Sequence, residues 1–157
     1  MEKVTIDRID RKILRILQGD GRISNVALAK AVGLSPTPCL ERVKKLEKHG
    51  VIEGYYAKVN ADKLGSPLLV FVEITLTRTS ADSFAEFSEA ARRTDEILEC
   101  HLVSGNFDFL IKARVADMAA YRRLLGETIL NMPGVNESRT YVVMEAIKQE
   151  NKVLIRG

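Results

Sequence analysis

The 157-residue sequence has only two cysteines and two histidines, and it has no long apolar run. The cysteines lie far apart, which suits a reducing compartment, and no Cys/His group has the spacing of metal ligands. A membrane-spanning helix needs about 18 consecutive apolar residues, and no segment approaches that length. The N-terminal segment is charged and lacks the apolar core of a signal peptide. We therefore expect a cytoplasmic protein with no metal, no cofactor and no membrane partner.

Catalytic groupings are also missing from the sequence. Cys39 and His49 would lie ten residues apart on one expected helix, a rise of about 15 Å, and so cannot form a catalytic pair. Cys39 is better interpreted as a small buried apolar residue. No constellation of acid, base and nucleophile stands out in the second half of the chain, so we do not expect an enzyme.

Charge is unevenly distributed along the chain. Residues 1–60 contain 12 Lys and Arg against 7 Asp and Glu, a net charge of +5, whereas residues 61–157 contain 12 against 14, a net charge of −2. This asymmetry indicates a basic module joined to a neutral or acidic one. Chance clustering is the alternative interpretation.

The first third of the chain predicts three helices. Apolar residues recur at spacings of three and four in IDRIDRKILRILQ, and two glycines follow. Ser24 is a good N-cap for a short second helix, which Gly33 ends. The glycine-containing joint to the third helix has the length found in helix-turn-helix motifs.

Two prolines stand where the third helix should begin. With Ser35 as N-cap, Pro36 falls at the first helical position and Pro38 at the third, where backbone N–H groups have no helical partner. The prolines therefore stiffen the start of the helix and do not break it. A helix that presents short donors and cations at this end is suited to the DNA major groove.

Arg42 is the longest donor near that end, and we expect it to bind guanine in a bidentate manner. A solvated helix with pairs such as Glu41–Lys45 is the alternative. The predicted DNA-binding residues are Arg22, Ser35, Pro36, Thr37, Pro38, Arg42 and Lys45.

Beyond residue 50 the pattern changes. Residues 51–60 predict extended structure, a wing or a tether, and residues 61–67 predict a break. Strands are expected at 68–77, 97–103, 107–115 and 138–147, with helices after Ser80 and Asp117. This β-α-β-β-α-β order predicts an α+β, ferredoxin-like sheet with both helices on one face. The predicted domains are residues 1–50 (helix-turn-helix), 51–67 (hinge or wing) and 68–157 (ferredoxin-like).

The face of this sheet opposite the helices is expected to be apolar, with Leu69, Phe71, Ile97, Val103, Leu110, Tyr141 and Val143 on it. Such a patch marks an interface, so we expect it to pack against another copy of the chain. An error in the strand register is the alternative.

Long segments of the chain resemble the Lrp/AsnC family of bacterial regulators. They are IDRIDRKIL, DGRISN, VGLSPTPCLERV, LLVFVEITL, ECHLVSGNFDFLIK, AYRRLLGETIL and PGVNESRTYVVME, which run in order over almost the whole chain. The resemblance implies a winged helix-turn-helix domain, a hinge, and an ACT-like (RAM) ferredoxin-like domain that binds an amino acid. It also implies homodimers formed through the sheet and further assembly, often to octamers.

The resemblance further implies an effector site between subunits, near a G-x-x-D turn that corresponds to residues 105–108. The effector-binding residues carried over by position are Gly105, Asn106, Asp108, Met118, Tyr141 and Val142. Close relatives often have Asp at the position of Asn106 and Tyr at that of Phe109, which concerns effector preference and not the fold. Without the resemblance, SGNFD would be interpreted as a hairpin turn.

We therefore expect a sequence-specific DNA-binding transcriptional regulator that responds to leucine or a similar amino acid. The main alternative is an architectural DNA-binding protein without an effector. An RNA-binding module is a second alternative, but FDFLIKARV lacks the glycine-containing pattern of RNA-stacking sheets. A regulatory subunit of an amino-acid enzyme is a third.

Overall fold

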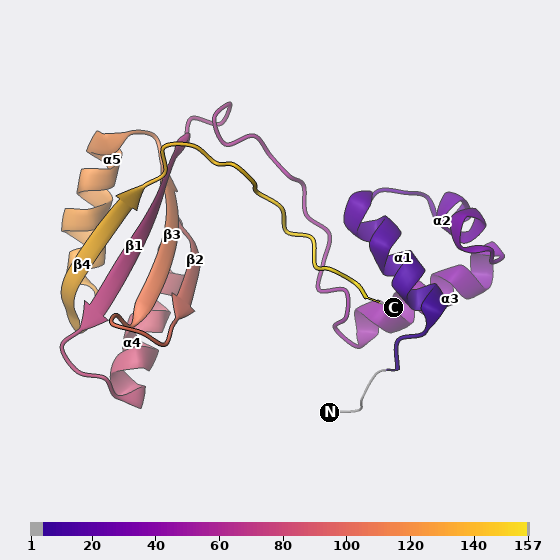
Figure 1. Ribbon diagram of the computed structural model, residues 1–157, viewed down its shortest axis with the longest axis horizontal. Coiled ribbons are helices and arrows are strands. Elements are labelled where there is room, and N and C mark those ends of the chain that lie inside the picture. The colour runs from indigo at the N-terminus through magenta and orange to yellow at the C-terminus, as the bar shows by residue number, and fades with distance from the viewer. Residues whose placement is uncertain (1–4, 157) are drawn as a thin grey trace. The chain divides into compact units, whose positions relative to one another are not determined.

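The computed structural model describes residues 5–156, which form two compact units. Of these, residues 5–58 and the tail 149–156 belong to unit 1, and residues 59–148 belong to unit 2. Figure 1 shows unit 1 in indigo to violet with the yellow tail, and unit 2 in magenta to orange. In the structure the tail contacts the helices of unit 1.

Unit 1 contains three helices: α1 (Arg8–Gly19), α2 (Asn25–Val32) and α3 (Pro36–Lys48). The Ser24 side chain accepts from the Ala27 N–H, and Gly33 ends α2 at a φ of 77°, a left-handed conformation that favours glycine. The core holds Ile13, Leu28, Ala29, Val32, Cys39, Val43 and Leu46. The predicted three-helix unit and the burial of Cys39 are confirmed.

The segment after α3 folds back on the helical core without forming a strand. The N–H groups of Val51 and Ile52 both donate to the Leu46 carbonyl, at 2.9 and 3.2 Å. Both side chains are half-buried against the core of unit 1. Tyr55 then donates its hydroxyl to Glu47 Oε1 at 2.9 Å. Residues 51–60, predicted to be extended, are therefore irregular, and the first half of this segment is bound to α3.

The tail is attached to α1 by side-chain hydrogen bonds. Arg15 donates Nε and Nη2 to the Ile155 carbonyl at 3.2 and 2.9 Å. Gln18 donates to the Val153 carbonyl at 3.0 Å and accepts from the Val153 N–H at 2.6 Å. These bonds pair the tail with the exposed side of α1, about 140 residues away in sequence.

Unit 2 is an antiparallel sheet in the order β2-β3-β1-β4. Its strands are β1 (Leu68–Leu76), β2 (Ile97–Leu102), β3 (Phe109–Val115) and β4 (Val135–Val142). Its helices are α4 (Ala81–Arg92), capped by Ser80, and α5 (Met118–Arg123), capped by Asp117. Helix α5 continues as a π-helical turn, Leu124–Thr128, and a 3-10 turn, Ile129–Asn131. The ferredoxin-like order is confirmed, although β4 begins and ends earlier than predicted.

The core of unit 2 lies between the sheet and its helices. Alternate residues of β1 face it, and Val70, Val72 and Ile74 are fully buried. The Phe109 ring lies 4.4 Å from that of Phe87 and 5.7 Å from that of Phe84, centroid to centroid, so that β3 packs on α4. These aromatic contacts anchor α4 on the sheet.

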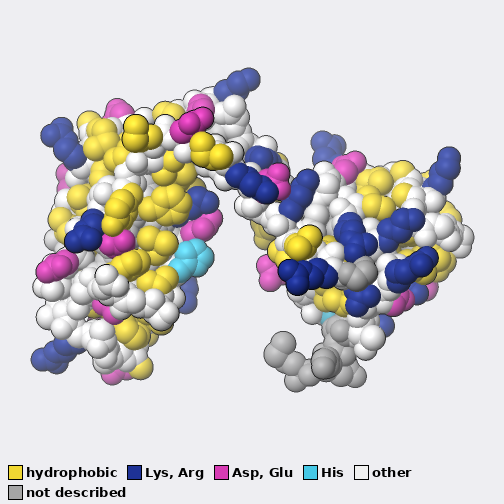
Figure 2. Space-filling view, viewed as in Figure 1, with side chains coloured by type: hydrophobic (Ala, Val, Ile, Leu, Met, Phe, Trp, Pro, Cys, Tyr) yellow, Lys and Arg dark blue, Asp and Glu magenta, His cyan; other side chains and the backbone are white. Residues whose placement is uncertain are grey.

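The opposite face of the sheet is less apolar than predicted. Ile97 was expected there, but it packs against the helix-side core because β2 and β3 shift register between Ile97 and Glu99. Polar pairs also lie on this face: Lys112 Nζ is 2.6 Å from Glu99 Oε1. Tyr141 donates its hydroxyl to Glu73 Oε1 at 3.0 Å. Figure 2 shows hydrophobic side chains interspersed with charged ones over unit 2.

Over residues 5–156, none of the helices has the length and apolar character needed to cross a bilayer.

Candidate nucleic-acid and effector sites

Helix α3 begins as the prolines predicted. Ser35 is the N-cap in extended conformation, at φ −76° and ψ 159°, and Pro36 occupies the first helical position. The Ser35 side chain makes no capping hydrogen bond. Asn25 of α2 donates its side-chain amide to the Pro36 carbonyl at 2.8 Å and so ties the starts of the two helices together. Sequence reasoning did not single out Asn25, since its partner is eleven residues away on another helix.

The start of α3 is exposed and rich in polar side chains. Ser35 and Thr37 are exposed there, Lys45 is exposed in the last turn of the same helix, and Arg22 is exposed in the turn before α2. Figure 2 shows Lys and Arg side chains gathered over unit 1. A cavity of about 360 Å³ lies beside the helix and is lined by Thr5, Asp7, Asp10, Pro38, Glu41, Arg42 and Lys45. The predicted DNA-binding residues thus occupy one helix and the turn before its partner helix.

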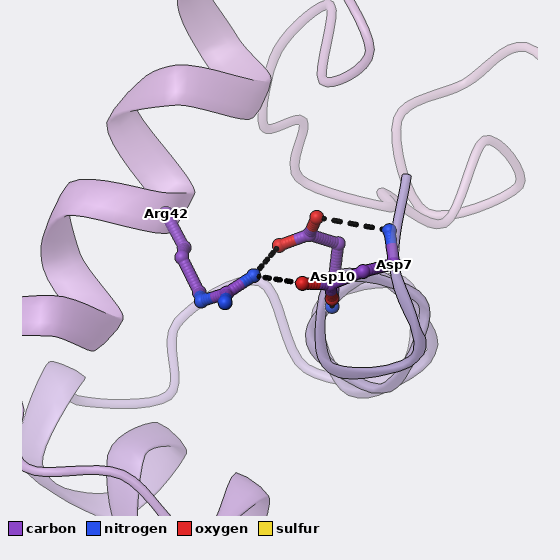
Figure 3. Close-up of polar contacts among 3 residues, drawn as sticks. All are labelled: Asp7, Asp10 and Arg42. Atoms are coloured by element: carbon purple, nitrogen blue, oxygen red, sulfur yellow. Dashed lines mark hydrogen bonds and ion pairs between the residues drawn. The ribbon is translucent and has the colours of Figure 1, made fainter. Parts of the chain in front are cut away.

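Arg42 has a different partner from the one expected of it (Figure 3). Its Nη1 lies 2.6 Å from Asp7 Oδ2 and 2.8 Å from Asp10 Oδ1. The backbone N–H of Asp10, and next the Arg42 guanidinium, hold the pKa of Asp7 below its ordinary value. The guanidinium predicted to bind guanine is therefore bound to two carboxylates of α1 and its cap. Local sequence patterns could not predict this pairing, because 35 residues separate Asp7 from Arg42.

The predicted effector turn lies between β2 and β3. Gly105 and Asn106 are exposed, and the Val103 N–H donates to the Asp108 carbonyl across the turn at 2.9 Å. Asp108 is tied to β1 by two bonds: its N–H donates to the Ile74 carbonyl at 2.8 Å, and its Oδ2 accepts from the Leu76 N–H at 2.7 Å. One carboxylate oxygen of Asp108 thus links the residue before β3 to the end of β1.

The other three predicted effector residues lie away from this turn. Tyr141 and Val142 are 45% and 43% exposed and pair with Phe71 and Val70 of β1, whereas Asp108 precedes the residue that pairs with Ile74. Four residues of strand correspond to about 13 Å. Met118 follows the far end of β3. A single chain therefore does not bring the six predicted residues together.

A small polar cavity adjoins the turn. Its volume is about 140 Å³, and its lining is Glu73, Thr75, Asn106, Phe107, Glu137, Ser138 and Arg139. Of the predicted effector residues, Asn106 alone contributes to it. Both signs of charge meet here, since Glu73 and Arg139 are paired across β1 and β4. Sequence reasoning missed these residues because the sheet register brings them together. Within residues 5–156, no group of three or more His, Cys, Asp or Glu is placed to hold a metal ion.

Comparisons with known proteins match both units. Residues 6–53 match the family model described as winged helix-turn-helix DNA-binding, and residues 69–153 match that of the Lrp/AsnC ligand binding domain. The leucine-responsive regulatory proteins of Escherichia coli K12 and Klebsiella pneumoniae are each 62% identical over 151 residues, which cover 96% of this chain and 92% of each relative.

Solved structures of similar proteins share the fold. A transcriptional regulator from Neisseria meningitidis, in complex with L-Met, superposes with a TM-score of 0.90 at 33% identity and covers 96% of this chain and 97% of its own. The structure of E. coli AsnC gives a TM-score of 0.87 at 27% identity, over 95% of this chain and 99% of its own.

Proposed function

Because the chain belongs to the Lrp/AsnC family of ligand-modulated, DNA-binding transcriptional regulators, we propose that it binds double-stranded DNA through the start of α3 and responds to leucine or a similar amino acid. The proteins it resembles are transcriptional regulators and not enzymes. The observation that carries the DNA-binding surface is the exposed start of α3, where the Ser35 hydroxyl has no capping bond. Its target, chromosomal DNA, would place it in the cytoplasm.

The proposed DNA contacts divide into two kinds. Ser35 and Thr37 are short donors at the end of the helix that enters the major groove first, so they are suited to base edges. Lys45 and Arg22 are exposed cations of the same unit and suit phosphates, which fix register without reading sequence. Pro36 and Pro38 keep the first turn rigid, because the proline ring fixes φ.

Replacing Lys45 with alanine should weaken binding to specific and scrambled duplexes alike. The loss of one phosphate contact should reduce the slope of log affinity against log salt by about 0.9. Fluorescence anisotropy over a salt series, with a duplex selected from a random pool and a scrambled duplex, measures both effects. Lys63→Ala, an exposed change in unit 2, is the matched control and should leave the slope unchanged. A wild-type affinity that does not fall with salt would contradict the phosphate contacts.

We propose that the polar ends of the effector bind at the cavity beside Asn106. The Arg139 guanidinium suits an α-carboxylate, and Glu73 or Glu137 suits an α-ammonium group, because charge-assisted hydrogen bonds recognise both ends. Leucine is supported by the names of the leucine-responsive relatives, and methionine by the L-Met complex of the Neisseria regulator. The separation of Asp108 from Tyr141 and Val142 supports a site completed by a second subunit. We propose a homodimer that assembles further to an octamer.

Replacing Arg139 with alanine should weaken leucine binding at least tenfold, since a hydrogen bond to a charged group contributes about 1.5–3 kcal/mol. Isothermal titration calorimetry of the full chain with leucine and with methionine measures this change. Arg92→Ala removes an exposed arginine of α4 and is the control. Unchanged binding by the Arg139 variant would exclude this cavity. If the wild-type protein bound DNA but no amino acid, it would be an architectural DNA-binding protein without an effector.

A further inference from the structure

Arg42 joins the middle of α3 to the start of α1 through a compact ion-pair cluster (Figure 3). One guanidinium nitrogen donates to both Asp7 and Asp10, at 2.6 and 2.8 Å. The Arg42 side chain is 33% exposed and that of Asp10 only 13% exposed. The Asp7 side chain is 46% exposed, so solvent screens its pair with Arg42 more than it screens the pair with Asp10.

The four carboxylate oxygens of the cluster are divided between two tasks. Asp7 Oδ1 accepts from the Asp10 N–H at 2.8 Å, and Asp10 Oδ2 accepts from the Asp7 N–H at 3.2 Å, which is a capping box at the start of α1. The other oxygen of each residue binds Arg42. The same two side chains therefore cap α1 and bind Arg42 of α3.

Releasing Arg42 to a base would leave these carboxylates unneutralised. Asp10 is mostly buried, and a charge that loses its partner in such a place is strongly unfavourable. The two uncompensated carboxylates would also lie beside Lys45, because Asp7, Asp10, Arg42 and Lys45 line one cavity. They would oppose the approach of DNA phosphates to this part of α3.

We infer that Asp7 and Asp10 hold Arg42 as a positioning residue, which fixes the orientation in which α3 presents Thr37 and Lys45 to DNA, and that Arg42 does not itself contact a base. This inference rests on the proposed DNA-binding function. In place of the guanine contact expected from the sequence, Arg42 forms intramolecular ion pairs. These ion pairs affect the specificity of DNA binding by fixing the position of α3.

A double-mutant cycle on Arg42→Ala and Asp10→Asn tests this inference. Asparagine retains a side-chain oxygen for the capping bond while it removes the charge that faces Arg42. Each variant is measured as the full chain, well below its unfolding temperature, with the selected and the scrambled duplex. We expect the ratio of specific to non-specific affinity to fall about tenfold in each single variant. The double variant should lose no more than Arg42→Ala alone, because both changes break one interaction.

Three readouts separate the inference from its rivals. The slope of log affinity against log salt should stay at the wild-type value in Arg42→Ala, and Arg42→Lys should recover part of the specificity ratio. A loss confined to Arg42→Ala, with altered preference at one base pair and a normal Asp10→Asn, would instead establish a base contact. Folded variants that all keep the wild-type ratio would reduce the cluster to a stabilising role. Failure of the proposed function would show in the wild-type protein, as an absence of salt-dependent DNA binding.

Discussion

Replacing Phe109 with alanine is expected to lower the free energy of unfolding of unit 2 by about 3–5 kcal/mol. Phe109 is buried at the start of β3 and contacts both aromatic rings of α4, Phe84 and Phe87. Truncation would remove the apolar area and leave a cavity between the sheet and the helix.

Hydrogen exchange of the full chain measures this effect locally, because the amides of β1 and β3 report opening of unit 2. Phe109→Leu, which keeps most of the side-chain volume, should lower the free energy by less than about 1.5 kcal/mol. Amides of α1 to α3 should exchange as in the wild-type protein. A decrease below about 1 kcal/mol in Phe109→Ala would mean that α4 is held mainly by other contacts.

Replacing Asp108 with alanine is expected to destabilise unit 2 by about 1–3 kcal/mol. The change leaves the Leu76 N–H without its 2.7 Å acceptor, and Leu76 is buried at the end of β1. An unsatisfied buried donor loses the full free energy of its hydration. The turn at residues 103–108 should loosen as well, and with it the exposed Gly105 and Asn106.

Asp108→Asn distinguishes a structural role from direct effector contact. The asparagine side chain retains an oxygen that can accept from Leu76, so thermal unfolding and leucine titration should both stay close to wild type. The opposite result is informative: normal thermal stability with leucine binding lost as severely as in Asp108→Ala would mean that the carboxylate charge contacts the effector.

Local sequence signals predicted the helix starts and the order of elements. Ser24, Ser80 and Asp117 cap helices through their side chains, and Ser35 occupies the N-cap position of α3, because a cap depends on residues only a few positions apart. The alternating pattern of β1 likewise fixed which of its residues face the helices. Signals within a few residues of one element were sufficient for both.

Features that depend on partners distant in the chain could not be predicted from local sequence patterns. The register shift at Ile97 arises from the pairing of β2 with β3, so alternation within β2 alone misplaced that side chain. Arg42 was judged by its helix face, whereas its partners belong to another helix. The cavity beside Asn106 was missed for the same reason, since Glu73 and Arg139 meet only through the sheet.

The attachment of the tail to α1 has a consequence for the order of events during synthesis. The hydrogen bonds from Arg15 and Gln18 reach residues 153–155, about 140 positions later in the chain. A chain emerging from the ribosome can therefore form all of unit 2 before unit 1 acquires these bonds. Unit 1 contains the earlier part of the described chain, yet its hydrogen bonds to the tail can form only after unit 2 has been translated.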